Sequence, residues 1–408
     1  MFIAPLRLLT ALISLAILAG GGWLIYEWWD GRWTINAAGY GEFSRPYWML
    51  WTGLALIAWS FLGRFVTPFL LAGPDHRPIE RKRAHGQQLP GPGGSELYVE
   101  THGRQGAPPV VLTHGWGLDS SFWRYAREDL GERFSVVCWD LPGLGRSKLG
   151  REKIVSLECM AECLAAVIEA GTARRPVLVG HSIGGMVIQT LLRDRPDLAP
   201  RIAGVVLLNT TLSNPLRCMT FSRVLRALQK PVLEPMEKAT AALHPLAWAL
   251  KWQSWMSGTA HIMVRFGFGR HPTRSQLKHV AHLITLARPR VEAQGNLAMM
   301  NWDASEALAK AGVPVLSIGG EHDLVTRPGA AREIAGAAPR AGLEIVEGAN
   351  HMGPLEAHEH YHNLIADFVL AVQPGSHADR PVTRQPPVRL TSAPRRRPPA
   401  EPRPSPQT

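Results

Sequence analysis

The residues best suited to covalent chemistry lie in the segment Gly180-His181-Ser182-Ile183-Gly184. A serine hydroxyl is a poor nucleophile until a base takes its proton, and it must stand clear of its neighbours to reach a substrate. Gly180 and Gly184 permit a sharp, close-packed turn in which a Cβ would clash. An apolar run, 176–179, precedes this segment, and a helix-like run, 186–193, follows it. The pattern therefore predicts a nucleophilic Ser182 on a turn between a strand and a helix.

A base and an orienting carboxylate follow this serine along the chain. His351 comes just after the apolar run 343–346, and Asp323 comes just past the run 313–318. An imidazole that takes the serine proton needs a carboxylate to hold its ring and to stabilise its charged form. His351 is therefore the candidate base and Asp323 the candidate acid, with Glu321 as the alternative acid.

Amide donors for a developing oxyanion are expected near a second glycine-containing turn. His114-Gly115-Trp116 follows the apolar run 110–113. Gly115 lets the backbone turn in closely, so that the amide of Trp116 can point at the reacting oxygen. The amide of Ile183, directly after the nucleophile, is the expected second donor. An ordinary glycine-rich turn is the alternative interpretation of His114 and Gly115.

Short apolar runs that alternate with helix-like stretches must position these residues. Runs of this kind, without polar alternation, are typical of parallel strands that helices cover on both faces. The runs cover residues 110–113, 134–140, 176–179, 204–209, 313–318 and 343–346. The pattern predicts an α/β catalytic domain over 86–373, built on a doubly wound, mostly parallel sheet.

The alternation stops between Thr210 and Gly312. This stretch is expected to be mainly helical, and it is rich in tryptophan and methionine. Apolar walls with soft thioethers suit an acyl chain or another greasy group. The alternative is that these side chains only pack the insert, 211–312, on the sheet.

Two uncharged runs, 8–26 and 47–63, precede the α/β pattern, with tryptophans near their ends. At about 1.5 Å per residue each approaches the roughly 30 Å hydrocarbon core of a bilayer. Residues 1–75 are therefore expected to form a membrane anchor of two transmembrane helices. A buried core helix is one alternative for each run, and a cleaved signal peptide ending near Ala19–Gly22 is another for the first.

The distribution of charge predicts which side the enzyme faces. The loop between the two runs has only two basic residues, Arg32 and Arg45, whereas Arg7 precedes the first run and five basic residues, from Arg64 to Arg83, follow the second. This asymmetry places both termini, and the catalytic domain, in the cytoplasm. The chain has a net charge of +11, and the segment 374–408, rich in proline and arginine, is expected to be disordered. Its charge suits anionic membrane lipids. No nucleic-acid-reading module accompanies it, so nucleic acid is not an expected partner.

Together these motifs resemble the α/β-hydrolase superfamily over 86–373. The closest likeness is to its lidded branch of esterases, monoacylglycerol lipases, cofactor-free haloperoxidases and carbon–carbon bond hydrolases. The segment 140–147 matches a further structural turn of the family, so Asp140 is interpreted as structural. The resemblance implies a helical lid at 211–312 and a reaction that needs no cofactor or metal. It also implies a catalytic triad and two oxyanion donors, which are Ser182, Asp323 and His351, and Trp116 and Ile183.

A serine at this position favours acyl transfer, because relatives that hydrolyse epoxides or haloalkanes use a carboxylate there. The sequence as a whole predicts a membrane-anchored serine hydrolase that cleaves an ester of a lipophilic substrate through an acyl-enzyme. A carbon–carbon bond hydrolase or perhydrolase with the same triad is the first alternative. A non-catalytic membrane scaffold that kept the fold is the second.

Overall fold

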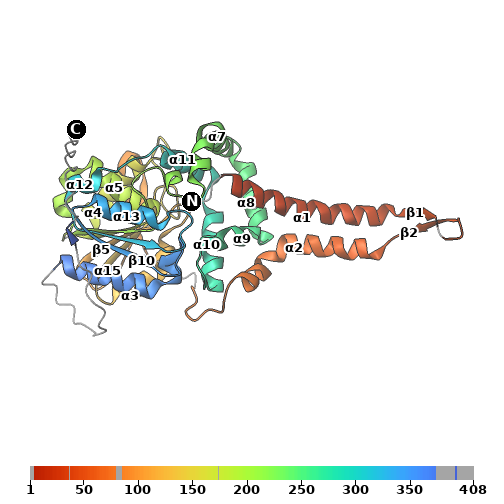
Figure 1. The fold of residues 1–408 in the computed structure, drawn as a ribbon, viewed down its shortest axis with the longest axis horizontal. Helices are drawn as coiled ribbons and strands as arrows, with labels where there is room; N and C mark the ends of the chain where they lie inside the picture. Colours follow the sequence, from red (N-terminus) through yellow and green to blue (C-terminus); the bar gives the residue numbers. More distant parts are fainter. Residues whose placement is uncertain (1–3, 36, 80–84, 173, 374–390, 393–408) are drawn as a thin grey trace, which may run out of the picture.

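A mostly parallel sheet stands at the centre of the fold (Figure 1). The computed structural model describes residues 4–35, 37–79, 85–172, 174–373 and 391–392. Within these residues the sheet has nine strands in the order β11-β10-β9-β8-β7-β5-β6-β4-β3. They are β3 (Gln87–Pro90), β4 (Glu96–Gly103), β5 (Pro109–Thr113), β6 (Ser135–Trp139), β7 (Val177–His181), β8 (Gly204–Leu208), β9 (Val315–Gly320), β10 (Arg340–Val346) and β11 (Thr391–Ser392).

The parallel part of the sheet confirms the predicted fold class. Strands β5 to β10 pair in parallel, and their ends differ from the predicted runs by at most three residues. The antiparallel strands β3 and β4 at one edge were not among the predicted runs. At the other edge, Thr391–Ser392 pairs with β10 and lies inside the segment predicted to be disordered. The rest of that segment, 374–390 and 393–408, lies outside the described residues.

Helices cover both faces of the sheet, which is why its strands carry unbroken apolar runs. On one face lie α3 (Arg124–Gly131) and α15 (His358–Val372). On the other lie α4 (Leu157–Gly171), α5 (Ile183–Asp194), α12 (Ala307–Ala311) and α13 (Pro328–Ala337) (Figure 1). A short helix, α14 (Gly353–Glu356), precedes α15.

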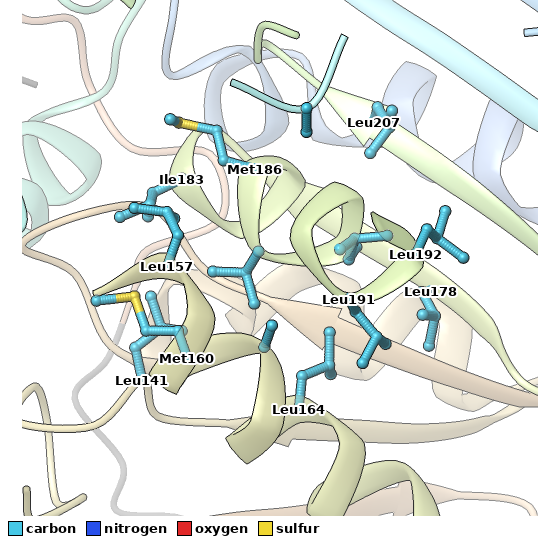
Figure 2. Packing of buried hydrophobic residues seen from close by; sticks show 14 of the residues in the cluster. Leu141, Leu157, Met160, Leu164, Leu178, Ile183, Met186, Leu191, Leu192 and Leu207 are labelled. Carbon is cyan, nitrogen blue, oxygen red and sulfur yellow. The ribbon is translucent and has the colours of Figure 1, made fainter. Parts of the chain in front are cut away.

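The core under α5 holds the start of that helix in place. Figure 2 shows Ile183 and Met186 of α5 among the side chains of α4, including Leu157 and Met160. All four are nearly or fully inaccessible to solvent. Burying a side chain of this size contributes roughly 1.5–3 kcal/mol. The residue directly before α5, Ser182, is thereby fixed against the sheet.

Between β8 and β9 the chain leaves the sheet and forms a layer of helices, here called the lid segment (211–312). Its helices are α6 (Ser222–Leu228), α7 (Glu234–Ala242), α8 (His244–Met256), α9 (Thr259–Arg265), α10 (Arg274–Leu286) and α11 (Pro289–Met300). The last helix of the segment, α12, returns to the face of the sheet and packs on α5. Helix α10 begins with a capping box, in which Thr273 and Gln276 satisfy each other's backbone amides. In Figure 1 the helices α8 to α10 stand between the sheet and the N-terminal helices.

The N-terminal helices form a hairpin that projects from the lid segment (Figure 1). It consists of α1 (Ala4–Asp30), the short strands β1 (Arg32–Ile35) and β2 (Gly41–Ser44) at its tip, and α2 (Tyr47–Leu71). Among the described residues, α1 and α2 are long and apolar enough to cross a membrane by length and composition. They pack closely where Gly21 faces Gly53, since a Cβ on either would lie within 3 Å of the other's carbonyl oxygen.

The base of the hairpin is bound to the lid segment, which the sequence did not predict. Ser14 of α1 donates to the carbonyl of Gln253 at 3.1 Å and to the hydroxyl of Ser257 at 2.8 Å. On α2, a Cβ at Gly63 would meet the carbonyl oxygen of Ser257 at 2.2 Å. The hairpin and the lid segment therefore pack against each other as parts of one structure.

Candidate active site

The turn that carries Ser182 has the strained geometry expected of a presented nucleophile. Ser182 adopts φ +54° and ψ −120° between β7 and α5, a conformation that non-glycine residues rarely adopt. A Cβ at Gly180 would lie 2.5 Å from the carbonyl carbon of Gly184, and a Cβ at Gly184 would lie 2.3 Å from the carbonyl oxygen of Thr113. Glycine is therefore required at both predicted positions.

Three side chains that are distant in the sequence meet at the carboxyl ends of the parallel strands. The Nε2 atom of His351 lies 3.1 Å from the hydroxyl of Ser182, and its Nδ1 atom lies 2.9 Å from Oδ2 of Asp323. Asp323 follows β9 and His351 follows β10. Glu321 does not take part, because its half-exposed carboxylate accepts a hydrogen bond from the amide of Gly348 instead. The structure thus brings together the three residues that the sequence singled out.

The carboxylate of Asp323 accepts hydrogen bonds from several backbone and side-chain donors. Its Oδ1 accepts from the amides of Val325 at 2.7 Å and Thr326 at 2.8 Å. Its Oδ2 accepts from the Thr326 hydroxyl at 2.8 Å and from the amide group of Asn209 at 2.9 Å. Burial raises the pKa of Asp323, but the neighbouring His351 and these hydrogen bonds outweigh burial and lower it. The carboxylate is therefore held ionised beside the imidazole.

Asn209 is a site residue that sequence reasoning missed. It follows β8, is buried, and adopts φ +49°. Besides its bond to Asp323, its Nδ2 donates to the carbonyl of Asn350 at 3.1 Å, and its Oδ1 accepts from the hydroxyl of Tyr361 at 3.0 Å. The loop after β8 begins with two threonines and offers no nearby carboxylate, so the sequence did not single it out. The position of Asn209 could have marked it as a site residue, because it is a polar residue at the end of a strand and that strand lies next to β9.

The loop of His351 is held from both sides. The Oδ1 atom of Asn350 accepts from the amide of His351 at 2.7 Å, and its Nδ2 donates to the carbonyl of Phe268 at 3.2 Å. The ring of His181 lies 2.9 Å from the carbonyl of His351 through Nε2 and stacks on Phe122. Burial and the neighbouring His351 hold the pKa of His181 well below its usual range, so the ring is neutral and Nε2–H donates. His181 therefore fixes the backbone of the base.

His114 and Gly115 shape the predicted oxyanion turn. His114 is fully buried; its Nδ1–H donates to the carbonyl of Gly115 at 2.8 Å, and its Nε2 accepts from the amide of Leu141 at 3.0 Å. Burial lowers the pKa of His114 to about 4, which keeps it neutral in these roles. Gly115 and Trp116 line the space beside the serine. Ile183 is the first residue of α5, where a helix leaves its amide without an intrahelical partner.

Asp140 lies in the structural turn, as the sequence indicated. It accepts from the amides of Ser120 at 2.6 Å and Arg146 at 2.8 Å, and so ties together the loops that follow β5 and β6. Burial, reinforced by the charge of Asp119, raises the pKa of Asp140 to about 7.

The space beside Ser182 is small. Its volume is about 20 Å³, enough for roughly one water molecule. Arg7 of α1 and Glu292 of α11 line it together with the turn residues. A polar cavity of about 690 Å³ adjoins it at Leu118, and an apolar cavity of about 360 Å³ adjoins it at Arg7, Ile284 and Glu292. Arg7 is a basic residue just before the first apolar run, and nothing near it in the sequence indicates that it lies here.

The arrangement is suited to acyl transfer. This chemistry needs a hydroxyl, an imidazole beside it and an ionised carboxylate behind the imidazole, and these three groups meet here. The amide of Ile183, which has no partner within its helix, directly follows the serine.

Comparison with known proteins gives matches over the same region. A family model described as "Alpha/beta hydrolase family" matches residues 110–365. The protein named "Putative carbamate hydrolase RutD" of Serratia proteamaculans is 25% identical over 279 residues, which are 68% of this chain and 97% of that protein. A pimeloyl-[acyl-carrier protein] methyl ester esterase of Pseudoalteromonas atlantica is 40% identical over 82 residues, which span only 20% of this chain and 30% of that protein.

Solved structures share the fold. An esterase from Exiguobacterium antarcticum superposes with a TM-score of 0.57 at 19% identity, over 70% of this chain and 99% of its own. That overlap leaves part of this chain without a counterpart.

Proposed function

The chain belongs to the alpha/beta hydrolase family, and from this premise we propose that it is a membrane-anchored serine hydrolase that cleaves carboxylic esters of lipophilic substrates. The observation that carries the proposal is the hydrogen-bonded series from Ser182 through His351 to Asp323. A hydroxyl that can pass its proton to an oriented imidazole is the requirement for nucleophilic attack on an acyl carbon.

The first half of the reaction forms an acyl-enzyme. His351 Nε2 takes the proton of Ser182 as the serine oxygen attacks the ester carbonyl carbon. The carbonyl oxygen becomes an oxyanion, which the amides of Trp116 and Ile183 receive. The imidazolium, stabilised by Asp323, then gives its proton to the departing alkoxide. An alcohol leaves, and the acyl group stays on Ser182.

The second half reverses these roles with water. His351 takes a proton from a water molecule, whose oxygen attacks the acyl carbon. The second tetrahedral intermediate collapses, the proton returns to Ser182, and a carboxylic acid leaves. His181 and Asn350 keep the imidazole in place through both halves, because they bind the backbone of the base rather than its ring.

The hairpin supports membrane anchoring. Helices α1 and α2 are both apolar over lengths that suit a bilayer, and most of the hairpin's large apolar side chains are exposed rather than packed against protein. The charge distribution favours a cytoplasmic catalytic domain. Retention of the first span is supported by Arg7, which lines the space beside Ser182 and would be lost with a cleaved segment. A C-terminal reporter that is active only outside the cytoplasm would contradict this orientation.

Labelling with a fluorophosphonate probe tests the proposed nucleophile. Wild-type protein is expected to be labelled, Ser182→Ala is not, and Ser305→Ala, which changes an exposed serine, is labelled like wild type. Wild-type protein that has not been exposed to the probe is then tested on monoacylglycerol and on short soluble esters, with a carbamate and a vinylogous dienol ketone as substrates of other classes. Folded wild-type protein that escapes the probe would favour a non-catalytic scaffold. Turnover of the dienol ketone alone would favour a carbon–carbon bond hydrolase.

A further inference from the structure

An apolar cavity of about 360 Å³ lies between α1 and the lid segment. Its walls come from the first turns of α1 and from the lid helices α7 to α11. Residues of this wall include Leu8, Ala11, Leu246, Ala247, Ala260 and Met263. The matched family region begins at residue 110, so α1 lies outside it.

The apolar cavity and the space beside Ser182 share a boundary. Arg7, Ile284 and Glu292 line both, so a single layer of side chains separates the apolar cavity from the nucleophile. The space beside Ser182 holds little more than one water molecule. A substrate larger than that must extend into an adjoining cavity, and for the apolar one this requires the shared side chains to move.

The shared layer is held by a buried group of charges. Arg7 donates to both oxygens of Glu237, at 2.7 and 2.8 Å, and lies 3.7 Å from Glu292. Lys251 bonds Glu292, and Asn296 donates to Glu237 at 2.9 Å. Burial raises the pKa of Glu237 and lowers that of Lys251. The two cations and two carboxylates balance, so the group offers no net charge to a ligand. Buried ion pairs of this kind contribute little net stability compared with apolar packing.

The outer end of the apolar cavity opens among exposed apolar side chains. Leu8, Leu243 and Leu246 line the cavity and are 43%, 58% and 57% exposed. They lie at the base of the hairpin. Beyond Ser14, the last residue bonded to the lid segment, the stretch of α1 up to Asp30 rises only about 24 Å. A bilayer with a hydrocarbon core of roughly 30 Å that surrounds the hairpin would therefore reach this opening.

The polarity of the two adjoining cavities indicates which half of an ester each would hold. The larger one, about 690 Å³, carries Asp119, Arg127 and Arg146 among its lining residues and suits a polar alcohol. The smaller one is lined mainly by aliphatic side chains. Because moving a methylene group from water into an apolar cavity is favourable, the aliphatic cavity favours a hydrocarbon chain.

We propose that the cavity between α1 and the lid segment binds the acyl chain of an ester drawn from the bilayer. The chain enters between Leu8, Leu243 and Leu246. The side chains around Arg7 and Glu292 then swing apart to let the carbonyl carbon reach Ser182. The inference rests on the proposed function, because it names the acyl group that this site would cleave.

Filling the cavity tests the inference. Ala247→Trp places a large ring in the cavity from α8, whereas Ala249→Trp places the same ring on an exposed position of the same helix. Full-length protein in detergent micelles is assayed with p-nitrophenyl butyrate and decanoate. Ala247→Trp is expected to lower kcat/KM for decanoate at least about tenfold and to leave butyrate within about twofold. Ala249→Trp is expected to leave both unchanged.

The butyrate assay separates the failure of this inference from that of the proposed function. Hydrolysis of butyrate that depends on Ser182 while the decanoate rate of Ala247→Trp equals that of wild type would overturn the acyl-chain site alone. Absence of turnover of either ester by wild type would overturn the proposed function. If Ala247→Trp loses butyrate activity as well, the test is repeated with Ala239→Trp, which fills the same cavity from α7. The measured quantity is then the ratio of kcat/KM for decanoate to kcat/KM for butyrate, which is expected to fall. An unchanged decanoate-to-butyrate ratio in that variant would reject the site.

Discussion

Asn209, at the end of β8, donates a hydrogen bond to the same carboxylate oxygen of Asp323 that contacts His351. The oxygen therefore has one partner that is the proposed base and another that is a fixed amide. Because Asn209 touches neither Ser182 nor the space for the substrate, it acts as a positioning residue. The hydroxyl of Tyr361 on α15 donates a hydrogen bond to Oδ1 of Asn209. A helix that covers one face of the sheet therefore helps to position Asp323.

Changing Asn209 is expected to alter both the rate and its pH dependence. Asn209→Gly keeps the backbone conformation and removes the bond to Asp323, so kcat should fall about 10- to 100-fold with little change in KM. Asn209→Asp places a second carboxyl group against Asp323, and two carboxyl groups at this distance share one proton. As that proton is lost the pair gains a second negative charge, which favours the protonated imidazole, so the acidic limb of the kcat profile should move to higher pH. A purely structural role would lower the rate without moving this limb.

Asp323→Asn is expected to lower kcat by about 10³- to 10⁴-fold. The substituted amide would donate to Nδ1 of His351, which moves the ring proton to Nε2 and leaves no lone pair for the proton of Ser182. Glu321→Gln is the matched control, since Glu321 lies two residues away and its carboxylate accepts from the loop amide of Gly348 rather than from His351. Steady-state kinetics on one soluble ester compare the two variants. Equal losses in both would reject the assignment of Asp323 as the acid.

Buried His114 should make the protein less stable in acid. The pKa of His114 is lowered to about 4 in the folded chain, against about 6.5 when unfolded, so the unfolded state binds the extra proton first. Stability is therefore full above about pH 6.5 and falls as the pH drops towards 4, by an amount on the order of 3 kcal/mol. Thermal unfolding between pH 4 and 7 should show a shallower loss for His114→Asn. An unchanged slope would mean that His114 does not titrate on unfolding.

The ion pair between Arg7 and Glu237 should show strong coupling. Arg7→Met leaves the carboxylate of Glu237 buried and without its cation, which is expected to cost about 3–5 kcal/mol of stability. The double variant Arg7→Met/Glu237→Met replaces both charges with apolar groups and should recover most of that loss. Denaturant unfolding of both single variants and the double variant in detergent measures the coupling. Additive losses would show that the two side chains act independently.

Local patterns in the sequence were enough to predict the central sheet and the residues that meet at its edge. The turn at Ser182 is fixed by the two glycines and by the apolar runs on either side, all within a few residues. Asp323 and His351 follow their strands directly, and parallel strands end at a common edge. The three residues were therefore expected at one edge of the sheet, because each follows a parallel strand.

Contacts between distant segments were not predictable in the same way. Nothing near Arg7 in the sequence marks it as a neighbour of Glu237, which lies 230 residues later. The role of Asn209 also depends on which strand lies beside β9, a matter of topology rather than local pattern. Strands β3 and β4 were missed because polar residues interrupt their apolar positions.

The wall that Arg7 contributes has a practical bearing on how the enzyme is prepared. A clone cut just before β3 would retain the whole sheet, each member of the triad and both proposed oxyanion donors. It would nevertheless lack the residues of α1 that enclose the space beside Ser182 and cover the lid helices. Activity or ligand selectivity measured on such a shortened domain would describe an enzyme in which the space beside Ser182 lacks one of its walls and is exposed to solvent there.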